Sequence, residues 1–346
     1  MASFARLDED AAPLERSVKR FHAVRERVLE QVRAVIVGQD EVLDQILIAL
    51  FVGGHCLLTG MPGTAKTLMV RAIAEALGLA FRRIQFTPDL MPSDITGTDI
   101  IEEDLETGHR KWTFVEGPIF GNILLADEIN RTPPKTQAAL LEAMQEHNCT
   151  VRGHTYRLPA PFFVLATQNP IELEGTYPLP EAQLDRFLMK VLIDYPDKDS
   201  EIDVLKLVRG EEVSAGPGGT AAVAPRVDPA QVFEARKQVH DIHVAPAIEQ
   251  YVMALVDATR HADRFDKELA SWIQVGASPR GGIALDRTAR VNAWLEGRTH
   301  VVPDDVRAVV HGVLRHRLIL SYDASAEGIR ADQVIDRILE LVAVPA

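Results

Sequence analysis

The sequence predicts an α/β fold in which a parallel sheet carries helices on both faces and a small all-α domain follows. Three observations predict it. Short apolar runs alternate with helical patterns through the first part of the chain, which is typical of a parallel sheet buried on both sides. A glycine-bearing loop joins one of these runs to a helix. From about residue 229 onward the pattern is helical.

The composition is that of an ordinary globular protein. The chain has 346 residues, enough for two domains, and 47% are hydrophobic and 25% charged. A net charge of −13 argues against a general nucleic-acid binder, although a local basic groove is compatible with it. Two cysteines give no disulfide framework or zinc site. Without a signal peptide or membrane-length apolar stretch, we expect a cytoplasmic protein that does not insert into membranes.

We expect four segments, which the composition and periodicity separate. In chain order they are a helical extension (1–35), an α/β core (36–209) with hairpins inserted near 87–111 and 150–157, a linker (210–228) and a helical domain (229–346). Asp40 is expected to cap the helix that follows it. The helices expected in the last segment are 231–240, 246–263, 269–275, 282–296 and 303–317.

The first apolar run, 56–59, leads into the loop Gly60–Thr67 and then into a helix. Strand, glycine loop, Lys-Thr and helix form a phosphate-binding loop, although a tight strand-to-helix turn is the alternative for the loop alone. Backbone N–H groups would surround phosphate oxygens, Lys66 would reach the β- and γ-phosphates, and the Thr67 hydroxyl would ligate Mg²⁺. Because Ala65 stands where glycine is usual, we expect a negative φ there.

A second apolar run, 123–126, ends in two carboxylates. Adjacent carboxylates at the end of a parallel strand repel each other unless a cation lies between them, so we interpret Asp127 as a Mg²⁺ ligand. Glu128 is then the group that orients and deprotonates water. Asn169, after a third run, can hydrogen-bond that water and the γ-phosphate. The alternatives are a helix N-cap at Asp127–Glu128 and a simple turn before Pro170.

Three arginines are candidates for contacts with the nucleotide. Arg186 either acts as an arginine finger on a neighbouring subunit or pairs with Asp185 or Glu181 on the surface. Arg131 is a second candidate for a contact at a subunit boundary. Arg280 lies in the first turn of a predicted helix, where a cation opposes the helix dipole. We therefore expect an anionic partner, interpreted as the γ-phosphate; the alternative is a solvated arginine.

Together these motifs resemble the AAA+ ATPases, and specifically the MoxR family. The resemblance covers about residues 36–320, and alanine before the loop lysine matches the MoxR-style variant. The segments that carry it are Gly60–Thr67 (phosphate-binding loop), 125–131 (Walker B), 166–170 (sensor 1), 179–187 (arginine-finger segment) and 276–280 (sensor 2).

The resemblance implies a P-loop domain with a helical lid, and Mg²⁺-dependent hydrolysis of ATP bound between subunits of a homo-oligomeric ring, usually a hexamer. It implies a chaperone that remodels, assembles or activates partner complexes, often with von Willebrand factor A domain proteins and sometimes in metal-cofactor insertion. The inserted hairpins are expected to face the pore or the partner. The alternative is a DNA-acting AAA+ motor or clamp-loader-like ATPase, which the acidic charge disfavours.

The resemblance also assigns nucleotide contacts residue by residue. The catalytic group is Lys66, Glu128, Arg131, Asn169, Arg186 and Arg280. The nucleotide contacts are Gly60, Met61, Pro62, Gly63, Thr64, Ala65, Lys66, Thr67 and Leu68 in the loop, with Val37, Gly38 and Gln39 against the adenine. Thr67 and Asp127 are the metal ligands.

Overall fold

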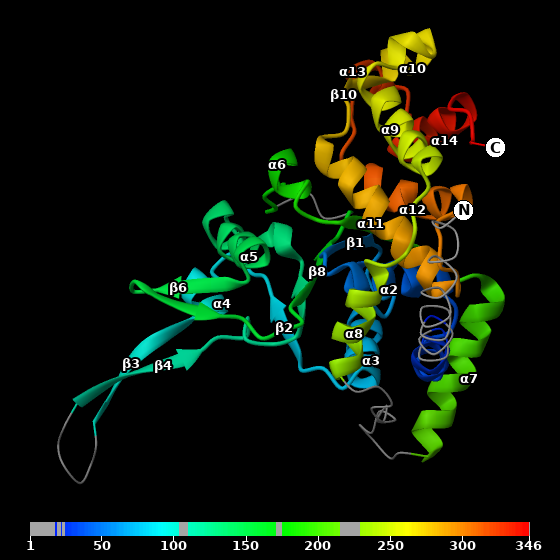
Figure 1. Ribbon diagram of the computed structural model, residues 1–346. Helices are drawn as coiled ribbons and strands as arrows, with labels where there is room; N and C mark the ends of the chain where they lie inside the picture. The colour runs from blue at the N-terminus through cyan, green and yellow to red at the C-terminus, as the bar shows by residue number, and fades with distance from the viewer. Residues whose placement is uncertain are drawn as a thin grey trace, which may run out of the picture.

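The computed structural model describes residues 18, 22, 25–103, 110–170, 175–214 and 229–345. Its centre is a five-stranded sheet in the order β2-β5-β8-β1-β9 (Figure 1). All neighbouring strands pair in parallel, which confirms the predicted α/β class. The strands are β1 (Cys56–Gly60), β2 (Phe81–Gln85), β5 (Ile123–Asp127), β8 (Phe163–Gln168) and β9 (Met189–Ile193).

Alternate residues of the central strands β1, β5 and β8 face two separate apolar layers. Leu58 and Leu125 pack in the layer that contains α2 (Asp40–Val52) and α3 (Lys66–Ala76). Leu57 and Leu124 pack in the opposite layer, beneath α4 (Pro92–Thr96) and α5 (Pro134–Glu146). Because both faces are covered at the centre of the sheet, β5 and β8 are nearly continuous apolar runs, whereas the outer strands β2 and β9 also carry exposed residues.

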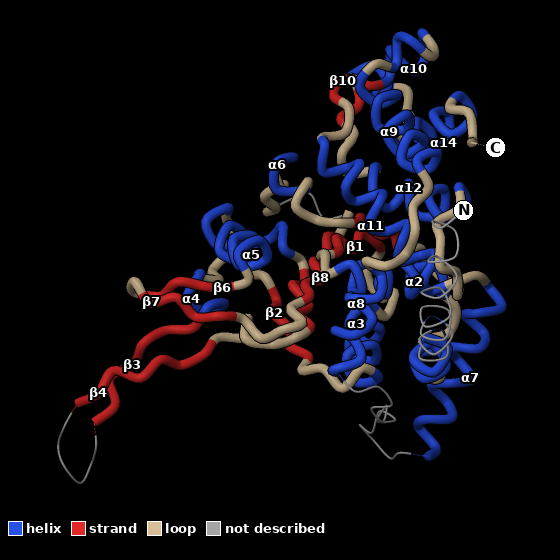
Figure 2. Tube along the Cα trace, viewed as in Figure 1, coloured by secondary structure: helices blue, strands red, loops and turns tan. Residues whose placement is uncertain are grey.

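Two antiparallel hairpins project from the sheet beside each other (Figure 2). They pair β3 (Gly97–Glu103) with β4 (Arg110–Glu116), and β6 (Asn148–Val151) with β7 (His154–Arg157), in the stretches where the sequence predicts insertions. Arg152 and Gly153 at the second turn have φ of 49° and 84°, as a two-residue type I′ turn requires. The rings of Phe114 and Tyr156 stack with centroids 4.0 Å apart, which joins the hairpins.

The C-terminal part is largely helical and packs on the first apolar layer. Phe51 of α2 and Trp294 of α11 meet edge to face with ring centroids 5.1 Å apart. None of the helices in the described ranges is long and apolar enough to cross a membrane. The helices are α8 (Pro229–Val239), α9 (Pro246–Arg260), α10 (Lys267–Trp272), α11 (Pro279–Leu295), α12 (Pro303–Leu314), α13 (Tyr322–Ala326) and α14 (Ala331–Leu341).

Three local expectations need correction. The helix expected at 269–275 ends at Trp272, because β10 (Ile273–Val275) pairs with β11 (Ile319–Leu320). Helix α7 (Lys198–Ser214) continues into the stretch expected to be a linker, whose remaining residues lie outside the described ranges, as do most of residues 1–24. Asp40 does not cap α2: Gln39 holds that position with φ 64°, and the Asp40 carboxylate pairs with Arg33 at 2.7 Å.

Candidate nucleotide-binding site

A cavity of about 470 Å³ lies where the carboxyl ends of three strands meet at one edge of the sheet. The loop after β1 lines one side of it with residues 62–68. Asp127 and Glu128, at the end of β5, line another side, and Thr167 and Asn169 enter from β8. The parallel topology thus brings together residues that are about 100 positions apart in sequence.

The loop before α3 is held by a side-chain hydrogen bond within it and by close packing on β9. The Thr64 hydroxyl donates to the Met61 carbonyl at 2.9 Å. A Cβ added to Gly60 would lie 2.3 Å from the Ile193 carbonyl oxygen, so only glycine allows this approach to β9. The expected negative φ at Ala65 is wrong. Its φ is 55°, and it occupies the N-cap of α3 in the left-handed region despite its methyl group.

Lys66 lies at the base of the cavity. Its ammonium donates to the Gly60 carbonyl, inside the loop. The pKa of Lys66 is lowered, because partial burial outweighs the opposing effect of the Asp127 and Glu128 carboxylates. A cation that is short of solvent and close to backbone donors suits an anionic ligand such as a polyphosphate.

Asp127 is fixed by two partners that the sequence did not reveal. The Thr167 hydroxyl donates to Oδ1 at 2.6 Å, and an Arg83 guanidinium nitrogen lies 2.7 Å from Oδ2. Asp127 and the hydroxyl-bearing Thr67 border the same cavity. Within the described ranges no three or more His, Cys, Asp or Glu side chains gather as a metal cluster. A hydroxyl plus a carboxylate fits Mg²⁺, which takes few protein ligands and completes its shell with phosphates and water.

Glu128 adopts a left-handed φ of 57° immediately after β5. Its backbone N–H donates to the Thr167 hydroxyl at 2.8 Å. The carboxylate accepts from the Gln85 amide at 2.9 Å and pairs with Arg131 at 3.0 Å. Arg131, expected at a subunit boundary, therefore contacts Glu128 of its own chain. Gln85 enters because β2 pairs with β5, a neighbour relation that the sequence does not disclose.

The residues expected against adenine lie beside the loop. Gly38 and Gln39 both have left-handed φ values, 69° and 64°. The Gln39 amide donates to the Asp194 carbonyl at 2.8 Å, just beyond β9. Since β9 pairs with β1, which carries the phosphate-binding loop, this segment borders the same edge of the sheet.

Arg186 and Arg280 lie at the opposite edge. Together with Asp185 and His55 they line a separate cavity of about 160 Å³. His55 directly precedes β1, whose five residues span about 16 Å at ~3.3 Å each. The structure therefore does not bring these arginines to the cavity that holds Lys66.

Both arginines have partners within the chain. The alternative pairing of Arg186 with Asp185 or Glu181 is not formed, and its guanidinium donates instead to the Leu141 carbonyl at 3.2 Å. The anionic partner of Arg280 in this structure is Asp185, at 3.8 Å, and not a phosphate-binding element.

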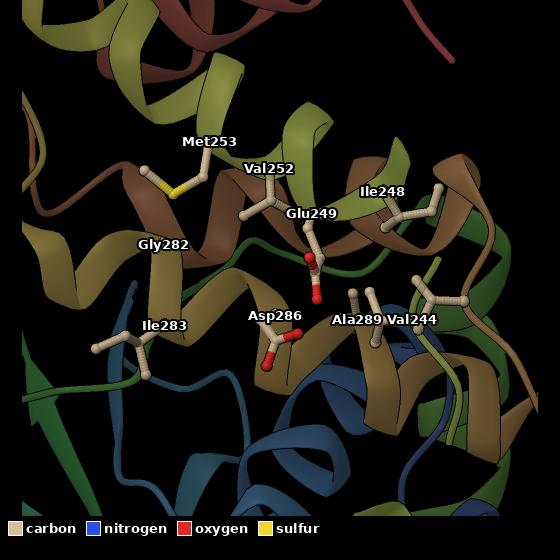
Figure 3. A pocket seen from close by; sticks show the side chains of 10 residues that line it. Val244, Ile248, Glu249, Val252, Met253, Gly282, Ile283, Asp286 and Ala289 are labelled. Carbon is tan, nitrogen blue, oxygen red and sulfur yellow. The ribbon is translucent and has the colours of Figure 1, made fainter. Parts of the chain in front are cut away.

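A third cavity, of about 360 Å³, lies between α9 and α11 (Figure 3). Its walls are mostly aliphatic, and the carboxylates of Glu249 and Asp286 point into it. Asp286 pairs with Arg290 on its own helix. Among the described residues, no lysine or arginine lines this cavity to offset the repulsion between its two carboxylates and a polyphosphate, so it does not suit a nucleotide.

Known proteins resemble this chain over most of its length. The model of the ATPase family associated with various cellular activities (AAA) matches residues 55–189, and the AAA lid domain model matches 269–338. The protein YeaC of Bacillus subtilis is 44% identical, covering 94% of this chain and 96% of its own. The chaperone MoxR1 of Mycobacterium tuberculosis is 43% identical, covering 92% and 82%. A crystal structure of a candidate ATPase from Cytophaga hutchinsonii superposes with a TM-score of 0.88 at 42% identity, covering 97% and 99%.

Proposed function

Because the chain belongs to the MoxR family of AAA+ ATPases, we propose that it is a Mg²⁺-dependent ATPase that works as a homo-oligomeric ring on a partner protein. The observation that carries the proposal is the cavity at the carboxyl edge of the sheet. One basic group, two carboxylates, three threonines and an amide line a space of about 470 Å³ there. This is the donor and acceptor set that hydrolysis of a nucleoside triphosphate requires.

The chain's own groups have distinct tasks in this proposal. The loop N–H groups and the α3 N-terminus bind the phosphates, and Lys66 neutralises their charge. Thr67 and Asp127 hold Mg²⁺, which when bound offsets the charge that develops on the phosphates. Glu128 accepts a proton from the attacking water, and Asn169 orients that water. Gln85 and Arg131 hold the Glu128 carboxylate in position through the contacts described above.

A single chain leaves this site incomplete. Arg186 and Arg280 lie at the far edge of the sheet, about 16 Å from the phosphate-binding loop by strand length. We therefore propose that both reach the nucleotide of the next subunit, which requires a head-to-tail interface repeated around a closed ring. A hexamer is the ring size that the family resemblance implies.

The partner is proposed to contact the paired hairpins. Ile101 and Trp112 are opposite each other on β3 and β4, and their side chains are 54% and 57% exposed. Exposed aromatic and aliphatic side chains on a projecting element are typical of protein-binding surfaces. The family resemblance implies a von Willebrand factor A domain protein as the class of partner. It also implies metal-cofactor insertion as one process in which the chain and this partner would act. A cytoplasmic location stays a prediction from the sequence.

The first experiment tests Glu128 as the proton acceptor. Glu128→Gln should retain ATP binding and slow hydrolysis about 10²–10⁴-fold, because the amide cannot accept the proton. Glu142→Gln on the exposed side of α5 is the matched control and should hydrolyse ATP normally. Near-normal turnover of Glu128→Gln in single-turnover assays would remove Glu128 from the mechanism.

The second experiment tests the shared site. Arg186→Ala should lose hydrolysis while its own Lys66, Asp127 and Glu128 stay intact. Mixing it with Glu128→Gln should restore activity, because one variant supplies the carboxylate and the other the arginine at the same interface. If the mixture is as inactive as its components, Arg186 does not act between subunits.

A further inference from the structure

Arg317, at the end of the α12 region, joins the helical C-terminal part to the segment that carries Arg186. Its side chain is 3% exposed, and its Nε lies 2.9 Å from Oδ1 of Asp185. One terminal nitrogen donates to the Phe187 carbonyl at 2.7 Å, and the other to the Leu188 carbonyl at 3.1 Å. The guanidinium thus grips the chain on both sides of Arg186 and just before β9.

The same carboxylate also holds the start of α11. Oδ2 of Asp185 accepts from the Ser278 hydroxyl at 3.0 Å and lies 3.8 Å from the Arg280 guanidinium. Ser278 is the N-cap of α11 and accepts from the backbone N–H of Arg280. Asp185 is therefore next to Arg186 in sequence and next to Arg280 in space, so one carboxylate ties the two arginines together.

The charge balance explains why Asp185 turns toward the helical part and away from Arg186. Burial lowers the pKa of Arg317 to about 10, so the guanidinium stays protonated at neutral pH. A buried cation needs an anion beside it, and Asp185 is that anion. With the carboxylate engaged by Arg317, the Arg186 guanidinium is left with a neutral backbone partner, the Leu141 carbonyl.

We infer that Arg317 is a positioning residue for ATP hydrolysis: through Asp185 it holds Arg186 and Arg280 as a pair presented to the nucleotide of the next subunit. The inference rests on the proposed function, in which these arginines act between subunits. It adds that their spacing is set by a group that touches neither ATP nor the neighbouring chain.

Arg315 supplies a matched control. Its side chain is 11% exposed, its Nε lies 3.0 Å from Asp332, and its guanidinium donates to the Lys190 carbonyl at 3.3 Å. It is partly buried and, like Arg317, bridges the C-terminal part to the chain at β9. Its partners do not include Asp185, so a defect in simple docking of the two parts would appear in both variants.

The first measurement compares Arg317→Lys with Arg315→Lys in the full chain. Lysine keeps the charge and loses the fork that grips Asp185 and the two carbonyls. Arg317→Lys should lower kcat about 10–100-fold, because a displacement of about 1 Å at a catalytic group costs up to ~10²-fold. Its affinity for a non-hydrolysable ATP analogue should change less than about twofold, since the binding cavity is untouched, and Arg315→Lys should keep both values within about twofold.

The decisive measurement is mixing. A 1:1 mixture of Arg317→Lys with Glu128→Gln should recover about a quarter of wild-type turnover, because a random ring pairs an intact carboxylate with intact arginines at about one interface in four. If Arg186→Ala recovers with Glu128→Gln and Arg317→Lys does not, the inference is wrong and the shared site stands. If neither recovers, the proposed shared site is wrong as well.

Asp185→Asn covers the case in which Arg317→Lys fails to fold or assemble, as judged by its melting temperature and elution volume. Asparagine is nearly isosteric and removes the charge that pairs with Arg317. It should show the same loss of kcat, the same unchanged analogue affinity and the same recovery on mixing. Wild-type turnover in an assembled Asp185→Asn protein would overturn the inference.

Discussion

Three non-glycine residues with left-handed backbones flank the candidate site, Gln39 with φ 64°, Ala65 with φ 55° and Glu128 with φ 57°. Each costs about 1–2 kcal/mol relative to ordinary helical geometry. Strain of this kind collects where the surrounding structure fixes a side chain or a set of N–H groups for function. Alanine's own preference for negative φ was a poor guide at Ala65, because the turn from β1 into α3 determines the conformation there.

Ala65→Gly should raise the free energy of unfolding by about 0.5 kcal/mol. Glycine removes the left-handed backbone strain of about 1–2 kcal/mol from the folded chain. It also increases the conformational entropy of the unfolded chain, which offsets about 0.4–1 kcal/mol of that gain. Ala65→Val, with a branched Cβ, should change the stability in the opposite direction by a larger amount. Melting of the nucleotide-free proteins checks this, and a less stable Ala65→Gly variant would contradict it.

His55 is buried beside the cavity that Arg186 and Arg280 line, and its imidazole is held in a single tautomer. Its Nδ1 accepts from the Val164 N–H at 3.0 Å, and its Nε2 faces the Met144 carbonyl at 3.0 Å and so carries the hydrogen. Protonation of Nδ1 would set two donors against each other. Burial lowers the His55 pKa from 6.5 to about 4, so the imidazole stays neutral in the folded chain.

Stability should therefore fall with acidity. Between pH 6.5 and 4, His55 binds a proton in the unfolded chain but not in the folded chain. The contribution of His55 to the free energy of unfolding is therefore fully present above that window and is lost as the pH falls through it. From pH 7 to 5 this residue should account for about 2 kcal/mol. Denaturant titrations should show a smaller loss in His55→Gln than in wild type. Exposed His154→Gln should behave as wild type, and an equal pH response in both variants would contradict the assignment.

At the scale of elements, the sequence predicts what depends on local pattern. The buried strands, the turn from β1 into α3 and both hairpins follow from apolar runs and turn residues. The local pattern predicts a helix that includes Ile273–Val275. The structure has a short strand there, because this segment pairs with Ile319–Leu320, more than 40 positions away. The Asp185–Arg317 pair is separated by 132 positions. Contacts of that range come from the packing of α12 on β9, which periodicity does not encode.

The β3–β4 hairpin depends on glycine at its root. Gly97 has φ 93°, and a Cβ there would lie 2.2 Å from the Val115 carbonyl oxygen. Gly97→Ala should cost about 3 kcal/mol, from backbone strain and the displacement of β4. Gly153→Ala, at φ 84° with no atom within 4 Å of the added Cβ, should cost about 1 kcal/mol.

The comparison separates the contact with β4 from the effect of φ. Melting temperatures and protease cleavage within the β3–β4 hairpin measure both variants. Gly97→Ala should be cleaved faster there than Gly153→Ala. Equal destabilisation of the two variants would show that β4 does not constrain the root of the hairpin.

At the scale of the whole molecule, the sheet separates the two halves of the proposed catalytic set. The groups proposed to bind phosphate and activate water lie at the carboxyl edge, and the two arginines lie at the amino edge with Asp185. The helical C-terminal part contacts the amino edge through Arg317 and His316, both of which donate to the Phe187 carbonyl. In the proposed ring, a displacement of this part would disturb the segment that carries Arg186 and would therefore act on the ATP of the next subunit.

Nucleotide binding in the loop cavity can be distinguished from nucleotide binding in the cavity between α9 and α11 by measurements on the intact chain. A ligand present at 100 times its Kd stabilises the folded state by about 2.7 kcal/mol. A non-hydrolysable ATP analogue with Mg²⁺ should therefore raise the melting temperature by several degrees.

Lys66→Met should abolish the shift, because it removes the cation at the base of the loop cavity. Ile283→Ser, at a 53% exposed position of the cavity between α9 and α11, should keep the full shift. A shift that survives Lys66→Met and disappears in Ile283→Ser would move the nucleotide to that second cavity and overturn the assignment of the site.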